Sequence, residues 1–170
     1  MKLRQGIVFL FILFCAFSET EQAAADTART ARPFGFYVGA ASEPWPSILS
    51  INLAYNVLDQ LRITAGTGTM FFGSSQGAGI KYIAMPEKPV SLIAGINVAR
   101  TRISDFLSGG FGLQPGADEI MWNTNVNFGI DWQAQNGFNL GAGLTWMNYQ
   151  DPADTIGTTV FPYLNIGWFY

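Results

Sequence analysis

Apolar residues alternate with small or polar residues along several stretches of this chain, each about ten residues long. The clearest stretch is 122–132, where one face would carry Trp122, Thr124, Val126, Phe128, Ile130 and Trp132. The other face would carry Asn123, Asn125, Asn127, Gly129 and Asp131. A period of two is typical of a β-strand, because successive side chains point to opposite faces. The sequence therefore predicts strands with one apolar face and one small, polar face.

The composition indicates which of these faces meets the surroundings. The 170 residues are enough for one domain, and only 12% are charged, about half the share of soluble domains. Hydrophobic residues make up 49% and the chain has 19 glycines. A net charge of -3 excludes a basic surface for nucleic acid. This combination favours a transmembrane β-barrel whose apolar faces point outward into lipid.

The first 25 residues have the features of a cleaved signal peptide. Lys2 and Arg4 precede an apolar run at 6–17, and small residues at 23–25 offer a cleavage site. The run is too short to span a bilayer. We therefore expect a signal peptide at 1–25, a loose periplasmic lead-in at 26–33 and an outer membrane barrel at 34–170. Cleavage removes Cys15, so the mature chain would contain no cysteine.

Eight segments carry the alternating pattern. They cover about 34–40, 48–56, 61–72, 78–84, 90–99, 122–132, 138–146 and 160–170. The turns that we expect include 57–60, 73–77 and the Asn-Gly turn at 134–137. Links after the second, fourth and sixth segments are short, and the longest link follows the fifth. The sequence thus predicts an all-β, eight-stranded, antiparallel up-and-down transmembrane barrel with short turns on the periplasmic side.

The aromatic residues agree with the thickness of a membrane. Trp122 and Trp132 are ten residues apart on one face, or roughly 26 Å along the membrane normal for a strand tilted by about 40°. The apolar band of such barrels is about 25 Å tall, with aromatic girdles at both edges. The predicted girdle residues are Trp122, Trp132, Trp146, Trp168 and Tyr170.

The signal peptide, the eight strands and the ending at 164–170 resemble the small eight-stranded outer membrane proteins of Gram-negative bacteria, the OmpX/OmpA/OmpW group. The resemblance implies an outer membrane location, lipids and lipopolysaccharide as surroundings, and a monomer. It also implies that the barrel-assembly machinery reads the apolar residues that lead to the terminal aromatic. These are Leu164, Ile166, Trp168 and Tyr170, where Tyr170 departs from the usual Phe. The resemblance carries little information about activity.

The inward faces contain few charges. We expect a polar cluster in the lumen formed by Arg62, Lys81, Asp131, Asn125 and Asn127. A barrel of eight strands is just wide enough for side chains to fill, and buried opposite charges must pair. We favour a lumen closed by these side chains. The alternative is a path for protons or ions.

The last predicted strand has two apolar faces. We expect Phe161, Tyr163 and Phe169 to point inward and to pack over Gly35 and Gly39 of the first strand. Pro162 cannot donate a backbone hydrogen bond, so the seam between these strands is predicted to be weakest there. A frayed rim is the simple consequence, and a lateral opening for lipid is the alternative.

Arg100 and Arg102 follow the outward face of the fifth strand and are candidates for contact with lipopolysaccharide phosphates. Snorkelling of arginines at the rim would explain them equally well. We identify no metal or cofactor site, because the acidic residues match no recognised metal loop. The absence of histidine argues against an enzyme with a histidine base, although a carboxylate-based enzyme that modifies lipid stays open.

The predicted function is therefore a structural or surface-interaction role in the outer membrane. The first alternative is a narrow channel or a carrier for small or hydrophobic molecules. The second is a soluble lipocalin-like barrel, in which the apolar faces would point into the lumen.

Overall fold

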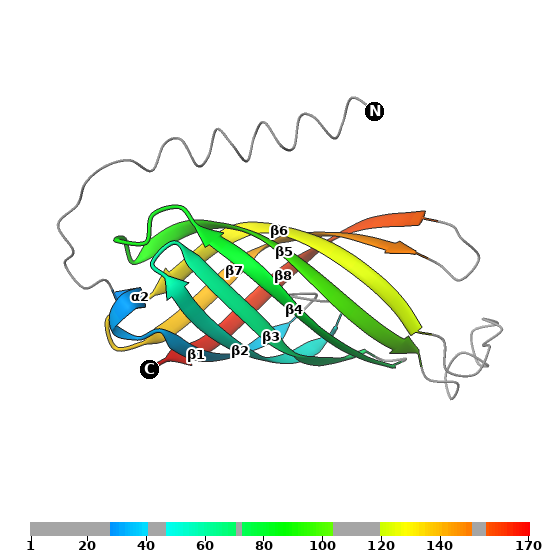
Figure 1. Ribbon diagram of the computed structural model, residues 1–170, viewed down its shortest axis with the longest axis horizontal. Coiled ribbons are helices and arrows are strands. Elements are labelled where there is room, and N and C mark those ends of the chain that lie inside the picture. The colour runs from blue at the N-terminus through cyan, green and yellow to red at the C-terminus, as the bar shows by residue number, and fades with distance from the viewer. Residues whose placement is uncertain (1–27, 41–46, 71–72, 104–119, 151–155) are drawn as a thin grey trace, which may run out of the picture.

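In a computed structural model, the chain forms a closed barrel of eight antiparallel strands in sequence order (Figure 1). The structure describes residues 28–40, 47–70, 73–103, 120–150 and 156–170. The predicted signal peptide and most of the long link after the fifth strand lie outside this part of the chain. The elements are α2 (Ala28–Ala31), β1 (Phe34–Ala40), β2 (Leu49–Leu58), β3 (Leu61–Met70), β4 (Gly73–Ile83), β5 (Val90–Ile103), β6 (Ile120–Gln133), β7 (Phe138–Gln150) and β8 (Ile156–Phe169). No helix in the described residues is long and apolar enough to cross a membrane.

The barrel wall is apolar outside and polar inside. In β2, Leu49, Ile51 and Leu53 are exposed, whereas Ser50 and Asn52 are buried. Strand pairing carries this alternation around the barrel, because cross-strand partners share a face. The predicted all-β, eight-stranded antiparallel fold is confirmed. The lipocalin-like alternative is wrong, because the apolar faces point away from the lumen.

The start of β4 differs from the prediction. Residues 73–77 were expected to form a turn, but they are the first part of the strand and pair with both β3 and β5. The alternation of apolar and polar residues that predicts a strand is absent here. The outward residues Ser74 and Gln76 are polar, as are Thr67 and Thr69 of β3. The ladder of backbone hydrogen bonds needs no apolar side chain, so the strand continues where the alternation stops.

Other strands also extend beyond their predicted limits. β2 continues to Leu58, with a register irregularity after Asn56. β7 continues to Gln150 and pairs there with Ile156, the first residue of β8. These extensions fall at strand ends, where the side chains no longer alternate and the sequence pattern gives no boundary.

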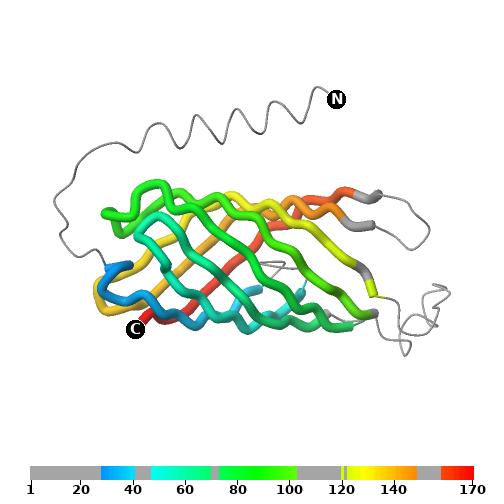
Figure 2. The backbone as a smooth tube through the Cα atoms, viewed as in Figure 1, coloured from blue at the N-terminus to red at the C-terminus, as the bar shows by residue number. Residues whose placement is uncertain are grey.

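The seam between β1 and β8 is shorter than the other strand pairs. Its register runs from Gly35 opposite Phe169 to Ala40 opposite Leu164, and β8 continues beyond it to Ile156. Figure 2 shows β8, in red, extending past the end of the blue β1. Pro162 therefore lies outside the β1–β8 ladder and is opposite Leu144 of β7.

The predicted ring packing over β1 glycines is correct for one ring of three. Phe169 is buried over Gly35, where an added Cβ would lie 2.5 Å from the ring. Tyr163 is also buried, but it packs over Gly129 and Gly143 on the far side of β8. Phe161 is 39% exposed, because it lies beyond the end of β1. The expectation for Tyr163 and Phe161 was wrong since sequence alone does not give the stagger between strands.

The turn between β6 and β7 fixes the end of the last strand. Gly137 has φ 98° and donates its N–H to the carbonyl of Ala134 at 2.9 Å. Its own carbonyl accepts the N–H of Phe169 at 2.7 Å. A left-handed backbone favours glycine, and a Cβ at this position would collide with the Phe169 carbonyl.

We therefore predict that Gly137→Ala destabilises the folded barrel by about 1–3 kcal/mol. The measurement is unfolding by guanidinium in detergent micelles. Gly141→Ala in β7 is the matched control, because its added Cβ would meet its nearest neighbours at 3.7 Å, an ordinary contact. Equal midpoints for the two variants would show that the turn conformation does not limit stability.

Candidate functional site

The short helix α2 is fixed to one end of the barrel, at the end where β8 terminates (Figure 1). Its Arg29 is only 1% exposed and donates hydrogen bonds to the carbonyls of Pro86 at 2.8 Å and Lys88 at 2.7 Å. Side chains of Asn56 and Gln133 bind the carbonyls of Arg29 and Ala28 in return. The expectation of a loose lead-in is therefore wrong for these residues. Backbone carbonyls and barrel side chains hold them in place.

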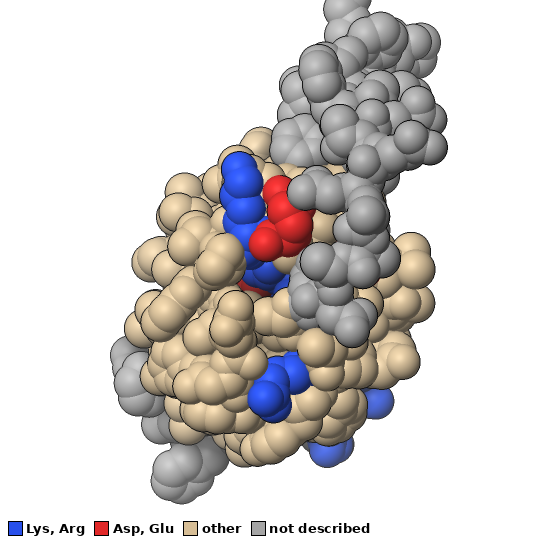
Figure 3. Space-filling view, turned by 90° about the vertical axis from the view of Figure 1, so that its left-hand side faces the viewer, with Lys and Arg blue, Asp and Glu red and all other residues tan. Residues whose placement is uncertain are grey.

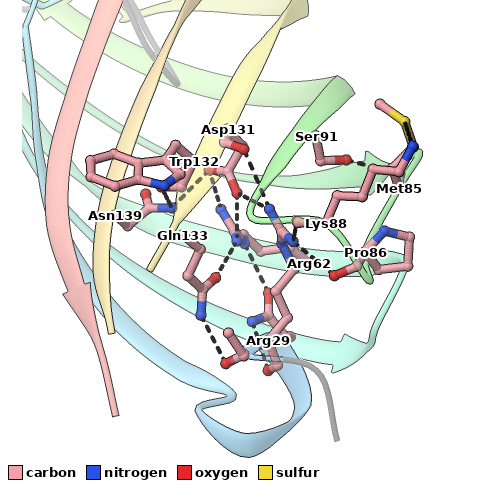
Figure 4. Close-up of polar contacts among 12 residues, drawn as sticks. Arg29, Arg62, Met85, Pro86, Lys88, Ser91, Asp131, Trp132, Gln133 and Asn139 are labelled. Carbon is pink, nitrogen blue, oxygen red and sulfur yellow. Dashed lines mark hydrogen bonds and ion pairs between the residues drawn. The ribbon is translucent and has the colours of Figure 1, made fainter. Parts of the chain in front are cut away.

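The Asp131 carboxylate of β6 lies at the centre of this end (Figure 4). One oxygen, Oδ1, accepts from Arg62 Nη1 and from Asn139 Nδ2, each at 3.0 Å. The other, Oδ2, accepts from Arg62 Nη2 and from Arg29 Nη2, each at 3.2 Å. Four donors from three other elements thus surround one carboxylate, and the pair with Arg62 is bidentate, the strongest geometry for such a contact.

Arg62 reaches across the lumen from β3 to β6. Besides Asp131, it donates Nε to Asn56 Oδ1 at 2.9 Å and Nη2 to Gln133 Oε1 at 3.2 Å. Its guanidinium carbon lies 4.5 Å from the centroid of the Phe169 ring, in cation–π geometry. We call the connected set the plug: Arg29, Asn56, Arg62, Asp131, Gln133 and Asn139.

The buried charges in this half of the barrel are unequal. Among the described residues, Asp131 is the one buried carboxylate, and the buried cations are Arg29, Arg62 and Lys81. Burial lowers the pKa of the Arg29 guanidinium, and the attraction of Asp131 raises it. Because desolvation costs several kcal/mol per ion, the arginines depend on this carboxylate.

Lys81 and the two asparagines predicted for the cluster are buried beside the plug rather than in it. Lys81 is opposite Arg62 in the β3–β4 ladder, and its Nζ lies 3.5 Å from the Tyr37 hydroxyl. Gly95 of β5 pairs with Lys81 on one side and with Asn127 of β6 on the other. Asn125 is the next inward residue of β6, two positions before Asn127. The structure thus brings Arg62 and Asp131 into direct contact and places Lys81, Asn125 and Asn127 further into the lumen.

The other half of the lumen is also filled by polar side chains. Near the far end, Thr101 Oγ1 bonds with Ser75 Oγ at 2.9 Å and accepts from Asn123 Nδ2 at 2.8 Å. Between the two ends, the Asn97 amide is buried and makes no hydrogen bond to the described residues. The plug is a connected set of charged and amide side chains, whereas the described hydrogen bonds at the far end join Ser75, Thr101 and Asn123.

The remaining predicted site residues point outward. Arg100 and Arg102 are exposed near the end of β5 that lies away from α2. The predicted girdle and assembly residues are all exposed, namely Trp122, Trp132, Trp146, Leu164, Ile166, Trp168 and Tyr170. Phe138 makes edge contacts with Trp132 and Trp168, at 5.6 and 6.1 Å between centroids. Figure 3 looks onto the α2 end, where charged side chains gather in a few groups amid a mostly uncharged surface.

Sequence reasoning missed four members of the plug. Asn56, Gln133 and Asn139 lie at inward positions near strand ends. The alternation predicts that they point into the lumen, but it does not predict which residues they contact. Arg29 precedes the first strand and has no periodic pattern around it. The sequence did indicate that Asp131 pairs with a cation. Buried opposite charges must pair, and Arg62 and Lys81 are the inward cations that the alternation predicts.

The fold and plug define a class, the small eight-stranded antiparallel barrel with an apolar exterior and a lumen lined by buried polar side chains. No family model matches the sequence, and no curated protein does. A solved structure with this fold is the crystal structure of Neisserial surface protein A, with a TM-score of 0.52 and 16% identity over 81% of this chain and 97% of that one. The Yersinia pestis outer membrane protein Ail, in a phospholipid bilayer nanodisc, aligns at a TM-score of 0.46 and 9% identity over 82% and 99%. At this identity the likeness to the Neisserial protein establishes the fold.

We predict that Asp131→Asn destabilises the barrel by about 3–5 kcal/mol, because it leaves Arg29 and Arg62 buried without their counter-charge. Unfolding in micelles measures the change. Glu87→Gln, which neutralises an exposed carboxylate at the same end of the barrel, is the control and should stay within about 0.5 kcal/mol of the original protein. If both variants unfold at one midpoint, the plug does not stabilise the fold.

Proposed function

We propose that this protein is an outer membrane β-barrel whose lumen is closed to ions and solutes, and which acts through its surface. The observation that carries the proposal is the plug, in which Arg62 joins opposite walls and Arg29 covers the end. A closed lumen leaves the lipid-facing wall and the links at the far end as the surfaces for interaction. Loops on a rigid scaffold commonly carry such roles.

The exterior supports a membrane location. Leu, Ile, Val and Trp side chains are exposed on all sides of the barrel. Proteins dissolved in water rarely expose so large a continuous apolar surface. α2 and the tight turns lie at one end, which we assign to the periplasm. The exposed face of β8 from Leu164 to Tyr170 would then be available to the barrel-assembly machinery before closure.

The plug also argues against the alternatives. An ion path would need room beside Arg62, but its nitrogens are bonded to both walls. A carboxylate-based enzyme needs an acid or base that reaches its substrate. Asp131 is buried, and its oxygens already accept four hydrogen bonds from the protein. We therefore infer a protein without enzymatic activity.

The location is tested by fractionation of bacterial cells that express the full chain. We expect a shortened protein in the outer membrane fraction that migrates faster on a gel before heating than after it, as folded barrels do. Recovery of the protein from the soluble periplasm would contradict the proposal.

For the closed lumen, we predict that the purified barrel produces no steady conductance in a planar bilayer. The double variant Arg62→Ser/Asp131→Ser removes the ion pair that spans the lumen with no change in net charge, and the folded variant should conduct. Arg100→Ser, on the outer wall, is the control and should stay silent. A steady conductance from the unmodified protein would disprove the closed lumen whatever the variants do.

A further inference from the structure

Two buried asparagines of the lumen have amide atoms that the described residues leave without hydrogen bonds. Asn97 of β5 is 1% exposed, and neither its Nδ2 nor its Oδ1 is bonded to a described residue. Asn52 of β2 is 0% exposed, and its Nδ2 donates to Ser50 Oγ at 2.8 Å, but its Oδ1 has no such partner. Because a buried amide costs free energy until its donors and acceptor are bonded, these atoms indicate a ligand in the lumen.

The two amide oxygens lie over glycines of the strands between them. Asn97 Oδ1 occupies the place where a Cβ of Gly79, on β4, would be. Asn52 Oδ1 would lie 2.8 Å from a Cβ at Gly66, on β3. Gly66 pairs with Gly77 in the β3–β4 ladder, so Gly79 is its diagonal neighbour, at roughly 7–8 Å. Strands β2 to β5 are consecutive in the barrel wall (Figure 1), and the two side chains therefore approach one small area from opposite sides.

A hydroxyl group lies in the same area. Thr64 is an inward residue of β3 and 3% exposed, opposite Gly79 in the ladder and two positions before Gly66. Its hydroxyl can both donate and accept a hydrogen bond. The two glycines thus form a floor without side chains, and amide or hydroxyl groups from three strands stand around it. We call this set the asparagine site: Asn52, Thr64, Gly66, Gly79 and Asn97.

We propose that the asparagine site binds internal water, about one or two molecules, that joins Asn97 to Asn52. No hydrogen bond joins the two amides directly, and a bridge through one water spans about twice the 2.9 Å of a single bond. A buried water typically makes about three hydrogen bonds, and the amide and hydroxyl groups of the site can supply them. The inference concerns the lumen and goes beyond the proposed role of the surface.

The chemistry of the site favours water over an ion. A cation would meet the Nδ2 donor of Asn97 and the ammonium of Lys81, the next inward residue of β4 after Gly79. An anion would meet two amide oxygens. Water donates to those oxygens and accepts from the amide nitrogen, so of the three it is the one that satisfies both kinds of group.

The test uses the full chain, isotope-labelled and folded in detergent micelles, with water itself as the probe. Rotating-frame NMR cross peaks between water and the side-chain amide protons of Asn97 report a long-lived bound water, and their sign distinguishes them from proton exchange. We expect these cross peaks in the unmodified protein. Relaxation dispersion of the water oxygen counts long-lived internal waters, and Asn97→Leu should lower that count by about one or two. Asn148→Leu is the control and should leave the count unchanged, because Asn148 is exposed on β7 and its Oδ1 accepts from Thr158.

Three results would overturn the water site. The first is the absence of water cross peaks at the Asn97 amide of the unmodified protein, a measurement that does not depend on any variant folding. The second is a higher unfolding midpoint for Asn97→Leu with an unchanged water count, which would show that the amide is buried dry. The third is a shift of the Asn97 amide resonances when sodium replaces choline at constant ionic strength, which would assign the oxygens to a cation.

Discussion

The buried Asp131 carboxylate is the contact on which the rest of the structure depends. It is the one buried acid of the described chain, and it joins α2, β3 and β7 to β6 through Arg29, Arg62 and Asn139. The interior of a barrel of eight strands is just wide enough for side chains, and we propose that this network closes it. The same contacts fix α2 at the end of the barrel where β8 terminates.

The proposed closure of the lumen leaves the outer wall as the surface for interaction. The wall is apolar over its middle, becomes polar where β3 and β4 carry Thr67, Thr69, Ser74 and Gln76, and is basic at Arg100 and Arg102. The polar outward residues at the end of the wall away from α2 are the ones that concealed the start of β4 from sequence reasoning.

Much of the fold was predictable because a strand with one apolar face must repeat its pattern at every second residue. The alternation at 122–132 located β6 and its inward asparagines, and the Asn-Gly pair located the turn that ends at Gly137. Predictions failed where no such constraint acts. Residues 73–77 form a strand without an apolar outward face, held by backbone pairing with β3 and β5. Phe161 is exposed because β1 ends at Ala40, and the sequence of β8 does not show where β1 ends.

By itself, the sequence determined which face of each strand points outward and which side chains enter the lumen, because both follow from a local period of two. Only the tertiary structure decided which of these side chains meet. Strand stagger and barrel closure bring Arg62 across to Asp131 and place Arg29 over the end. These contacts join residues distant in sequence, and a repeating local pattern contains no information about register between strands.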